Sequence, residues 1–191
     1  MQILKATPFA ERITECLMKQ GIIEEQRKEL YTFGIRQMTD MILNIVTVIC
    51  IGIWFRMLPE LVLFTLAYVS IRCYAGGYHA RTRMLCYFCS LVMFLAALPI
   101  IYILTGNSII SLAITAITSV IIFILAPVEH HNKPLRENEK KVYRQRARIF
   151  TGGELLIAVI AHLIKVPMIS AAVAAAFMML CIMLLAGRGH K

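Results

Sequence analysis

Charged residues are scarce in this chain: Asp, Glu, Lys and Arg make up 16% of its 191 residues, whereas 59% are hydrophobic. A soluble domain of this length needs far more charge to cover its surface, and a disordered chain is far less hydrophobic. The 6 cysteines are too few and too dispersed for a disulfide scaffold. The composition therefore predicts an integral membrane protein, with residues 1–191 forming a single domain.

Long apolar runs predict where this chain crosses the membrane, because a helix needs about 20 apolar residues to span a bilayer. We expect an all-α, polytopic helical membrane protein with about six spans, near residues 38–56, 58–75, 84–104, 108–126, 148–164 and 166–187. The second span is weakened by Glu60, and the fifth by Glu154 and His162. Ionisable residues inside a membrane are functional suspects, but here we favour structural hydrogen bonds between helices.

Acidic residues are also few, with 11 Asp and Glu against 20 Lys and Arg. If all six spans cross, every Lys and Arg except Arg56 and Lys165 falls on one side of the membrane. Cytoplasmic loops carry such an excess of basic residues, so we expect both termini and the 72–83 loop to be cytoplasmic. Topology accounts for the positive charge, and we therefore expect no nucleic-acid partner.

Two segments outside the polar loops have a distinctive pattern. Residues 1–36 predict amphipathic helices on the membrane surface, with Pro8 opening the first, Gly21 closing it, and a second helix running from Ile23 into the first span. Near the C-terminus, the small residues Ala171–Ala176 allow close helix packing. That packing is either within the chain or across a dimer face.

The loop between the second and third spans is the most polar short stretch between two apolar runs. Gly76-Gly77 breaks the preceding helix, and Thr82 is a good N-cap for the next one. Cys86 then lies near the first turn, where the helix dipole and the arginines of the loop favour the nucleophilic thiolate.

His79 precedes Cys86 by seven residues, which is about 10 Å along a continuous helix, so the loop must bend to bring the two together. A cysteine activated by a histidine is a typical nucleophilic pair.

Other interpretations of the same loop remain open. Cys86 and Cys89 have C-x-x-C spacing, which fits a thiol oxidoreductase or, with Cys73 or His79, half of a metal site. A small transporter is disfavoured, because the third, fourth and sixth spans carry no charge to line a pathway. We expect neither a metal nor another cofactor.

The pattern Arg72…Gly77-x-His79…Cys86 resembles the signature of the accessory gene regulator protein B (AgrB) family. A second match is Ala126-Pro127 followed by Lys133-Pro134 and a basic stretch. The resemblance implies a bacterial membrane cysteine peptidase that processes the AgrD precursor in quorum sensing and forms a homodimer. It also implies that His79 and Cys86 are catalytic, with Arg72 and Gly77 in supporting roles.

The resemblance further implies a mechanism. Cys86 attacks the junction between the signal core and the acidic C-terminal tail of the precursor, forming a thioester. The core then closes into a thiolactone or lactone ring.

The basic stretch at residues 129–148 is predicted to be a cytoplasmic loop. Its positive charge suits either anionic lipid headgroups or the acidic tail of the precursor. The candidate substrate-binding residues there are Lys140, Lys141, Arg144 and Arg146.

Overall fold

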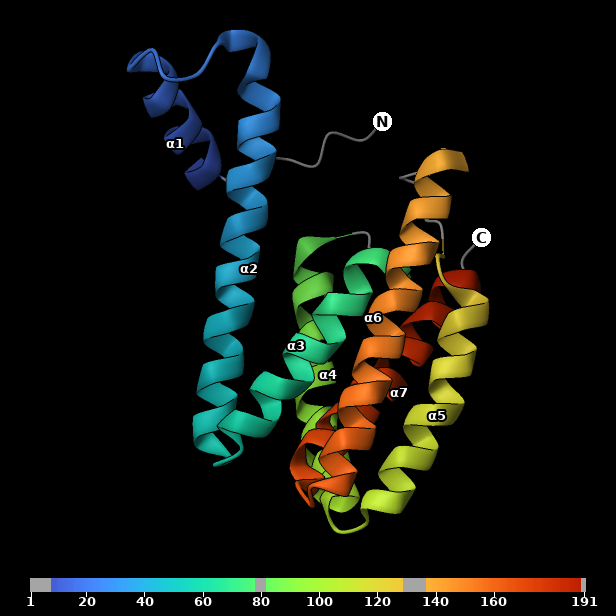
Figure 1. Cartoon of the computed structure of the whole chain (residues 1–191). Helices are drawn as coiled ribbons and strands as arrows, with labels where there is room; N and C mark the ends of the chain where they lie inside the picture. The colour runs from blue at the N-terminus through green and yellow to red at the C-terminus, as the bar shows by residue number, and fades with distance from the viewer. Residues whose placement is uncertain (1–7, 78–81, 129–136, 190–191) are drawn as a thin grey trace. The chain divides into compact units, whose positions relative to one another are not determined.

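The computed structural model describes residues 8–77, 82–128 and 137–189, and these residues form helices joined by short turns (Figure 1). The described helices are α1 Pro8–Lys19, α2 Lys28–Trp54, α3 Leu58–Ala75, α4 Arg83–Thr105, α5 Ser108–Leu125, α6 Glu137–Leu163 and α7 Pro167–Gly189, with a short 3₁₀ helix at Glu25–Arg27. The all-α prediction is confirmed.

The chain divides into two compact units, Met1–Thr47 and Val48–Lys191. In the first, α1 is the expected amphipathic helix, and it ends before Gly21, whose φ is 72°. The Thr32 hydroxyl donates to the Thr14 hydroxyl at 3.1 Å and ties the start of α2 to α1. The second helix begins at Lys28, later than expected, because the 3₁₀ helix precedes it.

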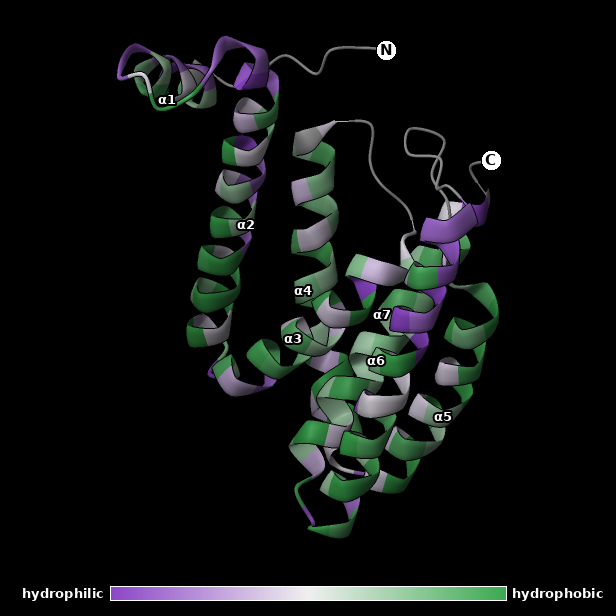
Figure 2. Cartoon of the chain, turned by 45° about the horizontal axis from the view of Figure 1, so that its top comes forward, coloured by the Kyte–Doolittle hydropathy of each residue, from purple (hydrophilic) through white to green (hydrophobic). Residues whose placement is uncertain are grey.

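Five of the described helical segments are long and apolar enough to cross a membrane, which confirms a polytopic membrane protein. They are Glu25–Trp54, Leu58–Ala75, Met84–Thr105, Ser108–Leu125 and Pro167–Arg188. Leu58–Ala75 qualifies despite Glu60. Hydrophobic residues dominate α4 and α5 in Figure 2.

The second half of α6 is too polar to meet that test, yet it covers the same depth as α5. Near one end of α5, Arg148 Nη2 of α6 donates to the Phe123 carbonyl at 3.4 Å. At the other end, Ser108 Oγ lies 2.8 Å from His162 Nδ1. Residues 148–162 therefore run alongside nearly the whole of α5. This geometry is consistent with the predicted fifth span near residues 148–164, whereas composition alone does not indicate it.

Helix α7 lies at the centre of the second unit and contacts α3, α4, α5 and α6. Its run Ala171–Ala176 is buried within the chain. On α5, the small polar residues Ser111, Thr115 and Ser119 are buried at helical spacing. The alanine run therefore serves packing within the chain, and it is not free to form a dimer face.

The second unit has two distinct ends. One carries the short turns around Arg56, Gly106 and Lys165: Phe55 lines an apolar pocket with Tyr102, and Ser108 meets both His162 and Ser170. The other carries the Gly76-Gly77 turn, the start of α4 and the end of α5. We call this second end the site end.

The predicted topology places the site end in the cytoplasm. Single cysteines introduced at Ala80 and Lys140 in a cysteine-free variant should be protected from a membrane-impermeant thiol reagent in intact cells. A cysteine at Gly106 should be labelled. Labelling of positions 80 and 106 from the same side would contradict an arrangement in which α4 crosses the bilayer.

Candidate functional site

Helices α3 and α4 run in opposite directions along the chain and contact each other through aromatic rings. The rings of Phe64 and Phe94 meet edge to face, with centroids 6.5 Å apart. Eight residues from each ring toward the connecting loop, the chain reaches Arg72 on α3 and Cys86 on α4. Tyr68, one turn before Arg72, interacts electrostatically with both.

Cys86 lies in the first turn of α4 with an exposed thiol that forms no disulfide. The Thr82 side chain accepts a hydrogen bond from the Leu85 amide at 3.3 Å, and the Thr82 carbonyl accepts one from the Cys86 amide at 3.0 Å. Thr82 is therefore the N-cap that the sequence predicted. Cys89, one turn further along, is half-buried and likewise forms no disulfide.

The Gly76-Gly77 turn is tightly enclosed, with φ of 69° and 117° at the two glycines. Arg72 Nη1 donates to the Gly76 carbonyl, so the guanidinium of α3 holds the turn that follows its own helix. A Cβ on Gly77 would collide with that guanidinium and lie 3.0 Å from the Met183 carbonyl of α7. Only glycine fits at position 77, because Arg72 and α7 occupy the space that a side chain would need.

The Arg72…Gly77 pattern and the Ala126-Pro127 pattern are far apart in the chain, but they meet at this turn. After α5 ends, the chain passes through a cis Ala126-Pro127 bond, and Val128 pairs with Gly76 in an isolated parallel bridge. The Val128 amide donates to the Ala75 carbonyl at 2.9 Å. The ends of α3 and α5 and the start of α4 thus converge at the site end. His79 and Lys133-Pro134 lie outside the described residues.

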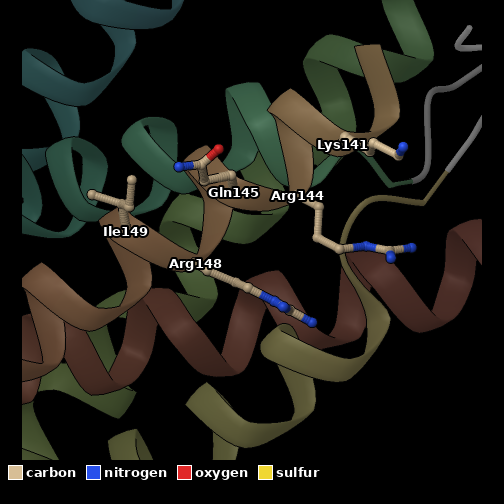
Figure 3. Close-up of a pocket in the computed structure, with 5 residues that line it drawn as sticks. All are labelled: Lys141, Arg144, Gln145, Arg148 and Ile149. Atoms are coloured by element: carbon tan, nitrogen blue, oxygen red, sulfur yellow. The ribbon is translucent and has the colours of Figure 1, made fainter. Parts of the chain in front are cut away.

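The prediction of a loop at residues 129–148 is wrong from residue 137 onward, because α6 begins at Glu137. The four candidate substrate-binding residues therefore lie on a helix. Arg146 faces α3, where its guanidinium carbon is 5.5 Å from the ring centroid of Tyr74. Lys141 and Arg144 line a pocket with Arg148 on another face (Figure 3). Lys140 lies two helical turns before the buried Ala147, so the two residues share one face of α6, which is directed toward the interior of the second unit.

Three residues near the site were not singled out from the sequence. Tyr68 precedes Arg72 by four residues, which is the helical spacing that would have indicated a shared face. Tyr74 stacks on Phe150 of α6, with ring centroids 5.3 Å apart. Ser70 donates to the Glu154 carboxylate, which bears out the expected structural hydrogen bond between helices. Pairings of this kind between distant segments have no local sequence signal.

The fold and this site define a class: a polytopic helical membrane protein with an exposed cysteine at a helix N-terminus and, on the preceding helix, an arginine that holds a glycine turn. The sequence model of the family Accessory gene regulator B matches residues 10–184. The chain therefore belongs to the AgrB family.

Two AgrB-like proteins of Clostridium perfringens are distant relatives. One, from strain SM101, is 24% identical over 140 residues, and another, AgrB-like protein 2 from strain 13, is 23% identical over 143. Each alignment covers 70% of this chain and 65% of the relative, so the chain spans just under two thirds of the length of these proteins. No solved structure matches the chain.

Gly77→Ala should displace Arg72 and loosen the site end. A side chain at a strongly positive φ costs about 1–3 kcal/mol, and the added methyl also meets Arg72 and Met183. We expect the Tm in detergent to fall by several degrees. The matched control is Gly153→Ala, which adds a methyl on α6 with no neighbour within 4 Å and should not lower Tm. Equal Tm values for Gly77→Ala and wild type would contradict this account of the turn.

Proposed function

We propose that this protein is a membrane cysteine endopeptidase that processes an AgrD-type precursor peptide for quorum sensing. The observation that carries the proposal is the position of Cys86, exposed at the start of α4 and close to Tyr68, which precedes Arg72 by one turn of α3. His79 lies in the five-residue segment that joins Gly77 to the start of α4. Membership of the AgrB family supports the same activity.

The first step of the proposed reaction is cleavage. Cys86 Sγ attacks the carbonyl carbon at the junction between the signal core and the acidic tail, while His79 accepts the thiol proton. The C–N bond breaks, His79 returns the proton to the leaving amine, and the core remains as a thioester on Cys86. Backbone amides in the first turn of α4 are suited to bind the developing oxyanion.

The second step is ring closure. A cysteine or serine side chain within the core attacks the thioester carbonyl and loses its proton, and Cys86 leaves as a thiol. The product is a thiolactone or lactone ring. Since the thioester supplies the reactive carbonyl, this step needs no cofactor, but water must be kept away from the acyl group.

Arg72 and Gly77 have positioning roles in this proposal. Arg72 binds the Gly76 carbonyl and thereby fixes the turn from which the His79 segment departs. Gly77 leaves room for the guanidinium. We propose a multi-pass location in the bacterial cell membrane with the site end in the cytoplasm. Homodimerisation remains a proposal that rests on the family resemblance.

Three single substitutions test the catalytic pair. Cys86→Ala and His79→Ala should each abolish cleavage of the precursor, measured in membranes with the protein inserted at wild-type levels. Cys89→Ala should keep most of the activity, because the proposed reaction uses one thiol. An inactive Cys89→Ala variant beside an active Cys86→Ala variant would show that Cys86 is not the nucleophile. Loss of activity in both cysteine variants would favour the thiol oxidoreductase, which needs both thiols.

Of the four basic candidates, Arg146 and Lys140 are best located to receive the acidic tail. Arg146 packs on Tyr74, which lies two residues after Arg72 on α3, so its charge is adjacent to the site turn. Tyr143 and Phe150 also contact the Tyr74 ring and hold this part of α6 against α3. A cation fixed beside the site attracts a carboxylate over about 8–10 Å at physiological salt.

Arg146→Glu should raise the precursor concentration needed for half-maximal cleavage by about fivefold, the effect of roughly 1 kcal/mol. A precursor whose tail acids are changed to Lys should recover part of that loss. The control is Arg144→Glu, which makes the same charge change on another face of α6 and should have little effect. If the altered tail restores nothing, Arg146 does not bind it.

A further inference from the structure

A positively charged pocket lies on the face of α6 that is next to α5 and away from Tyr74. It has a volume of about 390 Å³ and is lined by Lys141, Arg144, Gln145, Arg148 and Ile149. The charged ends of Lys141, Arg144 and Arg148 extend on the same side of the helix (Figure 3). The nearby acidic residues Glu137 and Glu139 do not line the pocket. Three cations therefore face one space.

The pocket lies at the depth where a membrane span ends. The Arg148 guanidinium donates to the Phe123 carbonyl at 3.4 Å and lies 5.9 Å from the centroid of the Phe123 ring. Phe123 belongs to the last turn of α5, which is a candidate span ending at Leu125. The boundary between apolar helix and polar headgroup region therefore passes through the pocket.

The surface below the pocket suits acyl chains. On α5, Val120 and Ile124 are exposed, and on α6 Ile149 is 62% exposed. These exposed apolar side chains lie on the two helices that meet at Arg148, from the level of Phe123 toward the other end of the second unit. A ligand that fits both parts has a negatively charged head and a long apolar body.

We propose that Lys141, Arg144 and Arg148 bind the phosphate group of an anionic phospholipid, whose acyl chains lie along α5 and α6. Two guanidinium groups match phosphate oxygens bidentately, and the lysine adds a third donor. A carboxylate-rich peptide shares the charge but not the apolar body. The exposed isoleucines and the depth of the pocket therefore favour lipid.

Native mass spectrometry of the detergent-purified full chain tests this proposal, with phosphatidylglycerol and phosphatidylcholine as the two probes. Wild type should retain phosphatidylglycerol in preference to phosphatidylcholine. Lys141→Gln with Arg144→Gln should weaken that retention roughly thirtyfold, because each of the two cations removed lowers the affinity about fivefold. Arg148 is kept intact, because it also binds α5.

Two control variants keep the test decisive. Lys140→Gln with Arg146→Gln removes the same charge from the other faces of α6 and should leave lipid retention within twofold of wild type. Lys141→Arg with Arg144→Lys keeps the charge and should keep the binding. Unchanged phosphatidylglycerol retention in the Lys141→Gln, Arg144→Gln variant would overturn the proposal.

Competition experiments separate the other possible ligands. Millimolar inorganic phosphate should not displace phosphatidylglycerol from wild type, because it lacks the apolar body. Displacement by phosphate alone would overturn the lipid assignment. Displacement by an acidic peptide, together with weaker precursor capture in the Lys141→Gln, Arg144→Gln variant, would assign the pocket to the precursor instead. The lipid measurement uses no precursor, so it stands or falls independently of the proposed peptidase activity.

Discussion

Close packing around α7 is the constraint on which the second unit depends. In a membrane, lipid tails are as apolar as leucine, so helices associate through van der Waals contact and hydrogen bonds instead of the hydrophobic effect. The small side chains of residues 171–176, five alanines and one valine, let four helices approach one central helix. Further along α7, the Met183 carbonyl faces Gly77. The position of α7 therefore fixes one wall of the turn that Arg72 holds from the other side.

The same packing allows a polar segment to accompany the apolar helices. The second half of α6 carries Glu154 and His162, which are costly in hydrocarbon unless they have partners. Ser70 of α3 donates to Glu154, and Ser108 of α5 pairs with His162. Thr151 is satisfied by the Ala147 carbonyl of its own helix. The neighbouring helices thus supply hydrogen-bond partners for the polar side chains of α6.

The sequence predicted features that depend on nearby residues and missed those that depend on distant ones. Gly76 and Thr82 mark the end of α3 and the start of α4 through their own backbone and side-chain chemistry, so both boundaries were found. The packing of Phe64 on Phe94, which joins α3 to α4, is a contact that no local pattern encodes. The meeting of Val128 with Gly76 is likewise a tertiary contact. The catalytic assignment of His79 came from the family pattern, and its geometry lies outside the described residues.

The basic stretch shows how an error in secondary structure hides function. Residues 137–148 were expected to be loop because of their charge, but Glu, Lys, Arg, Gln and Ala are good helix formers and no glycine or proline interrupts them. The side chains of a loop have no regular arrangement on faces, whereas on helix α6 Arg146 is directed toward α3 and Arg144 lines the pocket.

The two faces are electrostatically distinct. A helix with its side chains is about 10–12 Å across, which exceeds the screening length of about 8 Å at physiological salt. A lipid phosphate bound at Arg144 therefore leaves most of the field at Arg146 intact. One helix then has room to hold the protein at the membrane surface and to attract an acidic peptide toward Cys86, without either task neutralising the charge that the other needs.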